Sequence, residues 1–155
     1  MEVVVASDTH GTRDFIEKLV AKHPNANLYL HAGDSELYEE ELAPFRSVRG
    51  NCDWQVERRF IKLKLGSVGI YVFHGDHFYL DDDLLVNLAK ENDCDIIIYG
   101  HTHIPYTNYK YGVHIVNPGS IAYPRVTKAT YALITFTNQD DIKVEIKNYW
   151  GNNNG

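Results

Sequence analysis

The 155-residue sequence contains only two cysteines, Cys52 and Cys94. Two cysteines cannot build a disulfide framework, and so low a number fits a protein kept in a reducing compartment. No apolar stretch approaches the roughly 20 residues that a membrane-spanning helix needs, and the start MEVVVASDTHG lacks the basic residues and long apolar run of a signal peptide. We therefore expect a cytoplasmic protein with no membrane partner.

A basic excess is also missing, because 15 lysines and arginines face 21 aspartates and glutamates, a formal net charge of -6. Proteins that grip the nucleic-acid backbone usually carry a basic excess, so no strong nucleic-acid binding is expected, although bound divalent cations would reverse the charge locally. The chain shows neither internal repeats nor a linker rich in proline, glycine or serine. This predicts one domain over residues 1–149, and we expect the tail at 150–155 to be disordered.

Strand and helix patterns alternate along the first half of the chain. Apolar runs at residues 3–6, 28–30 and 45–48 predict buried strands. They are separated by one helical pattern that starts at residue 12 and ends before Pro24, and by a second over residues 39–42. Residues 60–65 and 68–73 predict a hairpin around Gly66 and Ser67. A helix capped by the aspartates at 81–83 follows, and then strands at 95–99, 114–116, 131–137 and 142–146. This order predicts an α/β (α+β) domain of sheets with helices outside.

Short polar loops beside glycine follow most of these strands. In open α/β sheets, loops at the carboxyl ends of strands converge on one crevice. The ligand-type side chains in the loops are Asp8, His10, Asp34, Asn51, His74, His101 and His103. Glycines stand beside them at positions 11, 33, 50, 75 and 100, where tight turns or close backbone approach are expected.

The mixture of imidazole, carboxylate and amide groups indicates a metal centre. Asp8 and His10 are separated by one residue, as are His101 and His103, so each pair projects the same way from an extended segment. The donor set suits manganese, iron, nickel or zinc better than a thiolate-rich structural zinc site. Any one of these motifs is common, and a lone strand-end histidine is more often structural. Five loops carry such residues, at positions 8–10, 34, 51, 74 and 101–103, and the five together favour a metal centre.

These motifs resemble those of the calcineurin-like metallophosphoesterase superfamily, and most of all its small YfcE-type phosphodiesterases. They are DTH at residue 8, GD at 33, GNCD at 50, HGD at 74 and GHTH at 100, with NPGS at 117. The resemblance runs from residue 1 to about residue 131. It implies a single-domain, four-layer αββα sandwich that holds two divalent ions at the strand ends. Manganese is the expected ion, with nickel, iron or zinc as alternatives.

The resemblance also implies a role for each ligand. The first ion is assigned to Asp8, His10 and His103, the second to Asn51, His74 and His101, and Asp34 is expected to bridge the two. Two such ions can share a hydroxide for in-line attack on phosphorus. The implied catalytic positions are Asn51, Cys52, Asp53 and His74.

The resemblance therefore implies a two-metal phosphodiesterase that hydrolyses small or nucleotide-like phosphodiesters. The alternative is a non-catalytic interaction scaffold, like the retromer subunit of the same fold. Where many family members have GNH, this chain has Cys52, and a thiol is a poorer proton donor near pH 7 than imidazole. GNCD is typical of the YfcE-type group, so we expect this difference to shift substrate choice. In the family, the pair His74-Gly75 is commonly followed by a histidine, whereas here Asp76 and then His77 follow. Asp76 is interpreted either as a turn residue or as a residue that orients a ligand or contacts substrate, and the role of His77 is open.

Other polar and aromatic residues are better explained by structure than by chemistry. His23 is interpreted as a surface charge at a helix end, and His114 as a structural histidine. His31 is interpreted as support or packing beside the GD motif, and Cys94 as a small buried residue.

Three tyrosines follow the GHTH motif, at 106, 109 and 111. We interpret them as cross-strand neighbours in a hairpin, with base stacking or a homodimer surface as alternatives. Arg125 is interpreted as a surface arginine, with contact to a substrate phosphate as the alternative.

Overall fold

The computed structural model describes residues 1–76, 80–124 and 128–150. The first sheet contains β1 (Glu2–Ala6), β2 (Leu28–His31), β3 (Arg46–Ser47), β9 (Thr130–Thr135) and β10 (Lys143–Asn148). The second contains β4 (Phe60–Leu65), β5 (Val68–Phe73), β6 (Ile96–Ile98), β7 (Tyr106–Lys110) and β8 (Val113–Asn117). The helices are α1 (Asp14–Lys22), α2 (Glu39–Leu42) and α3 (Asp82–Glu91).

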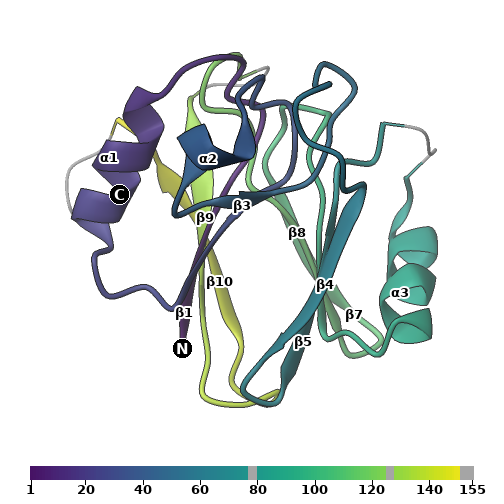
Figure 1. Cartoon of the computed structure of the whole chain (residues 1–155). Helices are drawn as coiled ribbons and strands as arrows, with labels where there is room; N and C mark the ends of the chain where they lie inside the picture. The colour runs from purple at the N-terminus through teal and green to yellow at the C-terminus, as the bar shows by residue number, and fades with distance from the viewer. Residues whose placement is uncertain (77–79, 125–127, 151–155) are drawn as a thin grey trace.

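The two sheets lie face to face, with α1 and α2 outside the first sheet and α3 outside the second (Figure 1). Their strand orders are β10-β9-β1-β2-β3 and β4-β5-β6-β8-β7. The predicted single-domain αββα sandwich is therefore confirmed.

The central strands are apolar on both sides because both sides are covered. Val3 and Val5 of β1 pack into the core between the sheets, whereas Val4 packs against the helices outside. In β6, Ile97 faces α3, and its two neighbours face the other sheet. Successive side chains of a strand point to opposite faces, so a strand buried on both faces requires a continuous apolar run.

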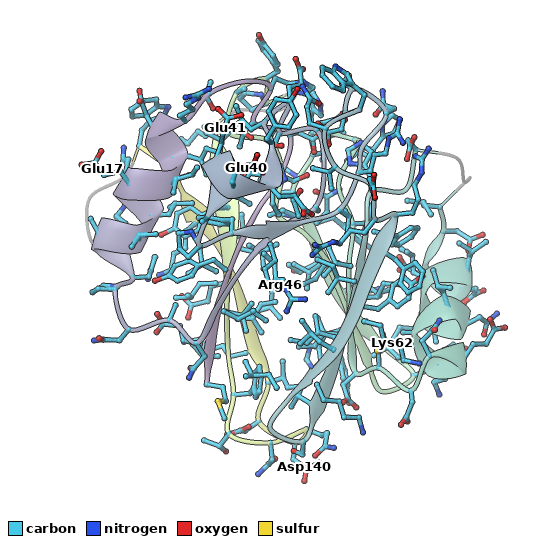
Figure 2. All side chains as sticks on the ribbon, in the orientation of Figure 1. Glu17, Glu40, Glu41, Arg46, Lys62 and Asp140 are labelled. Atoms are coloured by element: carbon cyan, nitrogen blue, oxygen red, sulfur yellow. The ribbon has the colours of Figure 1, made fainter. Side chains whose placement is uncertain are left out.

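The topology gathers the polar loops at one end of the sandwich. Strands β1, β2 and β3 run parallel in the first sheet, and β5, β6 and β8 run parallel in the second. Their carboxyl ends lie at the top in Figure 1, whereas Asp140, in the turn between β9 and β10, marks the opposite end (Figure 2). Charged residues away from the site, such as Glu17 and Lys62, are exposed at the surface.

Element boundaries differ from the sequence prediction in a few places. The helix expected from residue 12 begins at Asp14, because Thr12 is still part of the preceding turn, where its Oγ1 donates to the Thr9 carbonyl at 2.8 Å. The strand expected over residues 45–48 is only two residues long. The cap of α3 is as predicted, since Asp81 accepts a hydrogen bond from the Leu84 amide.

One interpretation of a histidine was wrong. His23 does end α1, but it is not a surface charge, because its Nε2 lies 2.7 Å from the Tyr131 hydroxyl. Burial lowers the pKa of the His23 imidazole, which favours the neutral ring.

The structural interpretations of Cys94 and Tyr109 hold, whereas Tyr111 lies in the turn between β7 and β8 and is not a cross-strand neighbour. Cys94 is buried, and the ring of Tyr109 lies 4.4 Å from that of its cross-strand neighbour His114. His77, Arg125 and residues 151–155 lie outside the described residues. Within the described ranges, no helix is both long enough and apolar enough to cross a membrane.

Candidate metal centre

Asp8 forms the floor of the polar cluster, directly after β1. Its side chain is fully buried, and its Oδ2 accepts hydrogen bonds from the Ser7 hydroxyl at 2.5 Å and the His101 amide at 3.2 Å. Oδ1 has no hydrogen-bond partner among the described residues and faces His103 Nε2 at 3.2 Å. Buried carboxylate oxygens rarely lack a hydrogen-bond partner in folded proteins, because nothing then compensates for the hydration lost on burial.

Three histidines hold one ring nitrogen away from the cluster. His74 Nδ1 lies 2.7 Å from the Ala32 carbonyl, and His103 Nδ1 lies 2.7 Å from the Tyr123 carbonyl. A carbonyl oxygen only accepts, so Nδ1 carries the hydrogen in both rings. His10 Nδ1 makes the equivalent contact, at 2.9 Å, with a carboxylate oxygen of Glu36. This arrangement is typical of metal-binding histidines, because it fixes the ring and directs Nε2 at the ion.

The Nε2 atoms converge on Asp8. His10 Nε2 lies 3.4 Å from His103 Nε2, and the Nε2 atoms of His10 and His74 both lie 3.9 Å from Asp8 Oδ1. Asp8, His10 and His103 form a group whose ligand atoms all lie within 4.8 Å of one another. These are the three residues assigned to the first ion from the sequence.

The remaining predicted ligands lie on the other side of His74. Its Nε2 is 3.2 Å from Asp34 Oδ2 and 3.0 Å from Asn51 Oδ1, which is also 3.1 Å from His101 Nδ1. Asp34 and His74 are buried, whereas Asn51 and His101 are exposed, so the cluster opens to solvent on this side. All seven predicted ligands are thus brought together.

The bridging role assigned to Asp34 stays a prediction. Asp8 is the carboxylate shared by two compact groups, one with His10 and His103 and one with Asp34 and His74. Asp34 belongs only to the second group, and its Oδ1 accepts a hydrogen bond from the Cys52 amide at 2.8 Å.

The pKa values of Asp34 and His74 are coupled through their contact. Burial alone lowers the pKa of His74, but the hydrogen bond that His74 donates to Asp34 and the charges of Asp8 and Asp34 raise it to about 9. Burial alone raises the pKa of Asp34, but the hydrogen bond and charge of His74 lower it to about 2. The cluster therefore favours a positive charge beside its carboxylates, carried by a proton or by a metal ion.

The backbone around the cluster is held in an unusual conformation. Non-glycine residues seldom adopt positive φ, and those that do gather at functional sites. Among the described residues, six of the eight with positive φ lie in the loops of this cluster: Asp8, His10, Asp34, Glu36, His101 and His103. Gly50 is required for a different reason, since a Cβ there would collide with the Asp34 backbone and carboxylate.

Asp53 organises the loop that carries Asp34. Its Oδ2 accepts hydrogen bonds from the Asp34 and Gly50 amides at 2.8 and 2.9 Å, and its Oδ1 accepts one from the Glu36 amide at 2.7 Å. Asp53 is also buried. Because these backbone groups engage both oxygens, this predicted catalytic residue is placed to position Asp34.

Cys52 lies exposed at the rim of the cluster. Partial burial and the charges of Asp34 and Glu36 raise the pKa of its thiol. The protonated thiol is therefore the favoured form at neutral pH, and a thiol with raised pKa is neither a good nucleophile nor a good proton donor.

Two supporting residues complete the site. Glu36, which sequence reasoning missed, reaches back to His10, and its ligand atoms form a third compact group with those of His10 and Cys52. The spacing Asp34-x-Glu36 repeats that of Asp8-x-His10, and this signal was available in the sequence. His31 supports the site from within, as predicted, because its Nε2 contacts the Thr9 hydroxyl at 2.9 Å.

The residues present fit divalent cations. The buried Asp8 oxygen without a donor and the fixed, converging Nε2 atoms are two independent features that a cation would satisfy. The mixed nitrogen and oxygen donor set suits manganese, iron, nickel or zinc.

Comparison with known sequences agrees with this chemistry. Residues 1–139 match the Calcineurin-like phosphoesterase superfamily domain. The chain is 36% identical to a probable metallophosphoesterase, YsnB, of Bacillus subtilis over 146 residues, which cover 89% of this chain and 86% of that protein. It is 24% identical to the phosphodiesterase YfcE of Escherichia coli, with coverage of 81% and 82%.

Comparison with solved structures gives the same fold. A conserved protein of Streptococcus pneumoniae, described as a predicted phosphoesterase, superposes with a TM-score of 0.83 at 29% identity and covers 96% of this chain and 89% of its own. Vacuolar Protein Sorting 29 of Cryptosporidium parvum superposes with a TM-score of 0.75 at 19% identity, with coverage of 94% and 96%. The second likeness shows the fold alone.

Proposed function

Because this chain belongs to the calcineurin-like phosphoesterase superfamily, we propose that it is a two-metal phosphodiesterase acting on small or nucleotide-like phosphodiesters. The observation that carries the proposal is the convergence of three fixed Nε2 atoms on the buried Asp8 oxygen that has no hydrogen-bond partner among the described residues. Assembly of a polar cluster of this kind costs both solvation and backbone strain, which bound cations would offset.

Seven side chains would hold the ions, with the division between first and second ion predicted from the sequence: Asp8, His10, Asp34, Asn51, His74, His101 and His103. Two divalent ions in such a site supply a water nucleophile of lowered pKa and neutralise charge on the phosphoryl group. Manganese is the proposed ion.

The chain itself contributes orientation. The Ala32 and Tyr123 carbonyls fix the rings of His74 and His103, and Asp53 fixes the loop of Asp34. Exposed Asn51 and His101 leave the cluster open for a phosphoryl group approaching from solvent. Preorganised donors of this kind need not reorganise during reaction, which is the basis of electrostatic catalysis.

The rim residue Cys52 sets the expected substrate preference. With a protonated thiol of raised pKa beside the cluster, departing oxygens must leave with little help from a proton donor. Esters whose leaving group is stable as an anion, such as p-nitrophenolate, are therefore the expected substrates, and alkyl phosphomonoesters the poor ones.

The test is hydrolysis of bis-p-nitrophenyl phosphate with manganese, with EDTA, and by Asp8→Asn. The expected result is turnover that requires manganese and is lost in Asp8→Asn, with much weaker cleavage of alkyl phosphomonoesters. A folded, metal-loaded protein with no activity on a panel of aryl diesters, phosphomonoesters and cyclic nucleotides would contradict the proposal.

A non-catalytic scaffold is the second candidate. Its support is the likeness in fold to Vacuolar Protein Sorting 29. The filled ligand set favours the enzyme, and the same screen decides between the two.

A further inference from the structure

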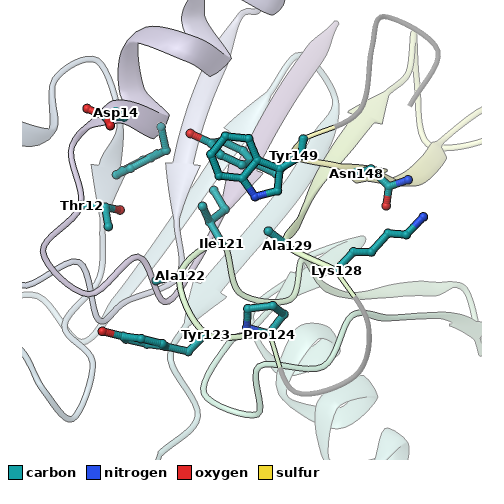
Figure 3. Close-up of a pocket in the computed structure, with 12 residues that line it drawn as sticks. Thr12, Asp14, Ile121, Ala122, Tyr123, Pro124, Lys128, Ala129, Asn148 and Tyr149 are labelled. Carbon is teal, nitrogen blue, oxygen red and sulfur yellow. The ribbon is translucent and has the colours of Figure 1, made fainter.

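A cavity of about 850 Å³ lies beside the metal centre, between the start of α1 and the residues that follow β8 and β10. Figure 3 shows Thr12 and Asp14 on one side of it, Asn148 and Lys128 on the other, and Ile121 and Ala129 between them. A cavity of this size falls in the range of small-molecule sites.

The cavity and the metal centre share a wall. Tyr123 lines the cavity, while its carbonyl accepts the hydrogen bond of His103 Nδ1 and its ring lies 5.2 Å from the ring of His10. The same segment is tied to the floor of the cluster, because Ser120 Oγ donates to the Asp8 carbonyl and accepts from the Tyr123 amide. A molecule whose phosphate sits at the metal centre therefore has this cavity next to it.

The lining is mainly apolar and aromatic. Phe15, Ile121 and Ala129 are buried contributors, and Tyr149 and Trp150 form an aromatic wall. Trp150 is 76% exposed, and Lys18 of α1 lies 4.1 Å from its ring centroid. Of the described lining residues, only Asp14 and Lys128 carry charge. Such a surface suits a flat, uncharged ring better than a second phosphate or a sugar alone.

From this geometry we infer that the cavity binds the flat aromatic group carried by one ester arm of the phosphodiester, a nucleobase or an aryl ring. The inference rests on the proposed function, because it treats the metal centre as the place where the phosphate binds. It adds that the arm retained on phosphorus determines which diesters are good substrates.

The kinetic test varies only the retained arm. Ethyl, phenyl and thymidine 5′ esters of p-nitrophenyl phosphate all release the same p-nitrophenolate. The phenyl and thymidine esters should have the higher kcat/KM, and Trp150→Ala should reduce these two values by roughly 5- to 100-fold, as expected for the loss of ring stacking, while leaving the ethyl ester unchanged. A thymidine ester favoured over the phenyl ester identifies a nucleobase as the natural group, and the reverse order identifies an aryl ring.

The binding test needs neither metal nor catalysis. Adenosine has no phosphate, so saturation-transfer NMR on EDTA-treated protein reports the cavity alone. Binding should be lost in Trp150→Ala and retained in Trp54→Ala, a matched change at another exposed tryptophan that does not line the cavity. The high exposure of Trp150 makes unfolding of the variant an unexpected result, which circular dichroism checks.

The two tests separate the inference from the proposed function. Hydrolysis of bis-p-nitrophenyl phosphate with no preference among the three arms and no adenosine binding overturns the inference and leaves the phosphodiesterase intact. Adenosine binding that depends on Trp150, without hydrolysis of any ester, supports an aromatic site in the cavity and overturns the phosphodiesterase, and with it the assignment to a substrate arm.

Discussion

At the scale of single residues, the site depends on how each histidine is held. His10 differs from His74 and His103 because its Nδ1 partner is a side chain, Glu36, and not a backbone carbonyl. A carboxylate raises the basicity of a metal-bound imidazole as well as fixing its orientation. Glu36 can be changed without altering any predicted ligand.

We predict that Glu36→Gln weakens metal binding by roughly 10- to 100-fold, the usual effect of losing such a partner. Calorimetric titration of manganese into EDTA-treated protein measures the affinity. Glu40→Gln, which removes an exposed carboxylate from nearby α2, is the matched control and should retain normal affinity. Unchanged affinity in Glu36→Gln would show that His10 needs no such partner.

Cys52 makes a separate prediction about the leaving group. Cys52→His should increase kcat/KM for esters with poor leaving groups, by up to about 10²–10⁴-fold in a favourable geometry, and should have little effect on p-nitrophenyl esters. Cys52→Ala should alter aryl-diester cleavage little, because the protonated thiol transfers no proton. The measurement is kcat/KM across leaving groups of graded pKa. A slope for Cys52→His equal to that of the original protein would reject a missing proton donor.

The sequence predicted which residues form the site better than it predicted what each residue does. The seven ligands were found because each follows a strand end beside glycine. The positioning role of Asp53 could not be found, since it depends on three amides brought around one carboxylate by the folded loop. Glu36 was missed because it lies outside the GD motif at residue 33, although it follows the end of β2 as closely as His103 follows the end of β6.

At the scale of secondary-structure elements, the ends of β1 and β2 are joined by a buried histidine. His31, the last residue of β2, accepts a hydrogen bond at Nδ1 from the Gly33 amide, so its Nε2 carries the hydrogen and donates to Thr9. Burial lowers the pKa of His31 from 6.5 to about 4. The folded protein therefore keeps this ring neutral under conditions in which the unfolded chain protonates it.

The sign of the pH effect follows from that difference. The contribution of His31 is fully present above about pH 6.5 and is lost as the pH falls towards 4, because protons then bind the unfolded state preferentially. We predict that this group alone lowers the free energy of unfolding by about 3 kcal/mol between these limits. Urea unfolding of EDTA-treated protein at pH 7, 5.5 and 4 measures it.

His31→Gln is the control for this prediction, since it removes the titrating group and retains a polar side chain. The variant should be less stable at pH 7 but lose less stability on acidification. An acid slope equal to that of the original protein would show that other groups cause the loss. Asp34 and Asp141 contribute in a lower range, because their folded-state pKa values are about 2.

Elements were predictable where pattern and burial coincide. The run over residues 3–6 and the hairpin at 60–73 were predicted correctly, because a strand buried on both faces has a continuous apolar sequence and a hairpin has a turn signal. β3 was overestimated, since its pairing with β2 involves only two residues. The cavity beside Tyr123 was not predictable, because its walls come from α1 and from segments more than 100 residues later.

At the scale of the whole molecule, the metal centre joins loops from both sheets. Asp8, Asp34 and Asn51 lie in loops that follow strands of the first sheet. His74 and His101 lie in loops that follow strands of the second. Ions held by both sets of loops favour the folded state over the unfolded chain and stabilise it by mass action.

We therefore predict that manganese at about 100 times its dissociation constant stabilises the protein by roughly 2.7 kcal/mol for each ion bound. For a domain of this size that corresponds to a rise in Tm of roughly 5–10 °C. Thermal melts with manganese and with EDTA measure the difference, and Asp8→Asn should reduce it. Equal midpoints for the original protein under the two conditions would contradict binding across the two sheets.

The central claim is that two ions at this site make the chain a phosphodiesterase. The most direct measurement titrates manganese into EDTA-treated protein, at protein concentrations well above the dissociation constants, while hydrolysis of bis-p-nitrophenyl phosphate is followed in the same samples. The account predicts that activity rises until two ions are bound per chain and then stays constant. A plateau at one ion per chain, or no hydrolysis with the site filled, would contradict it.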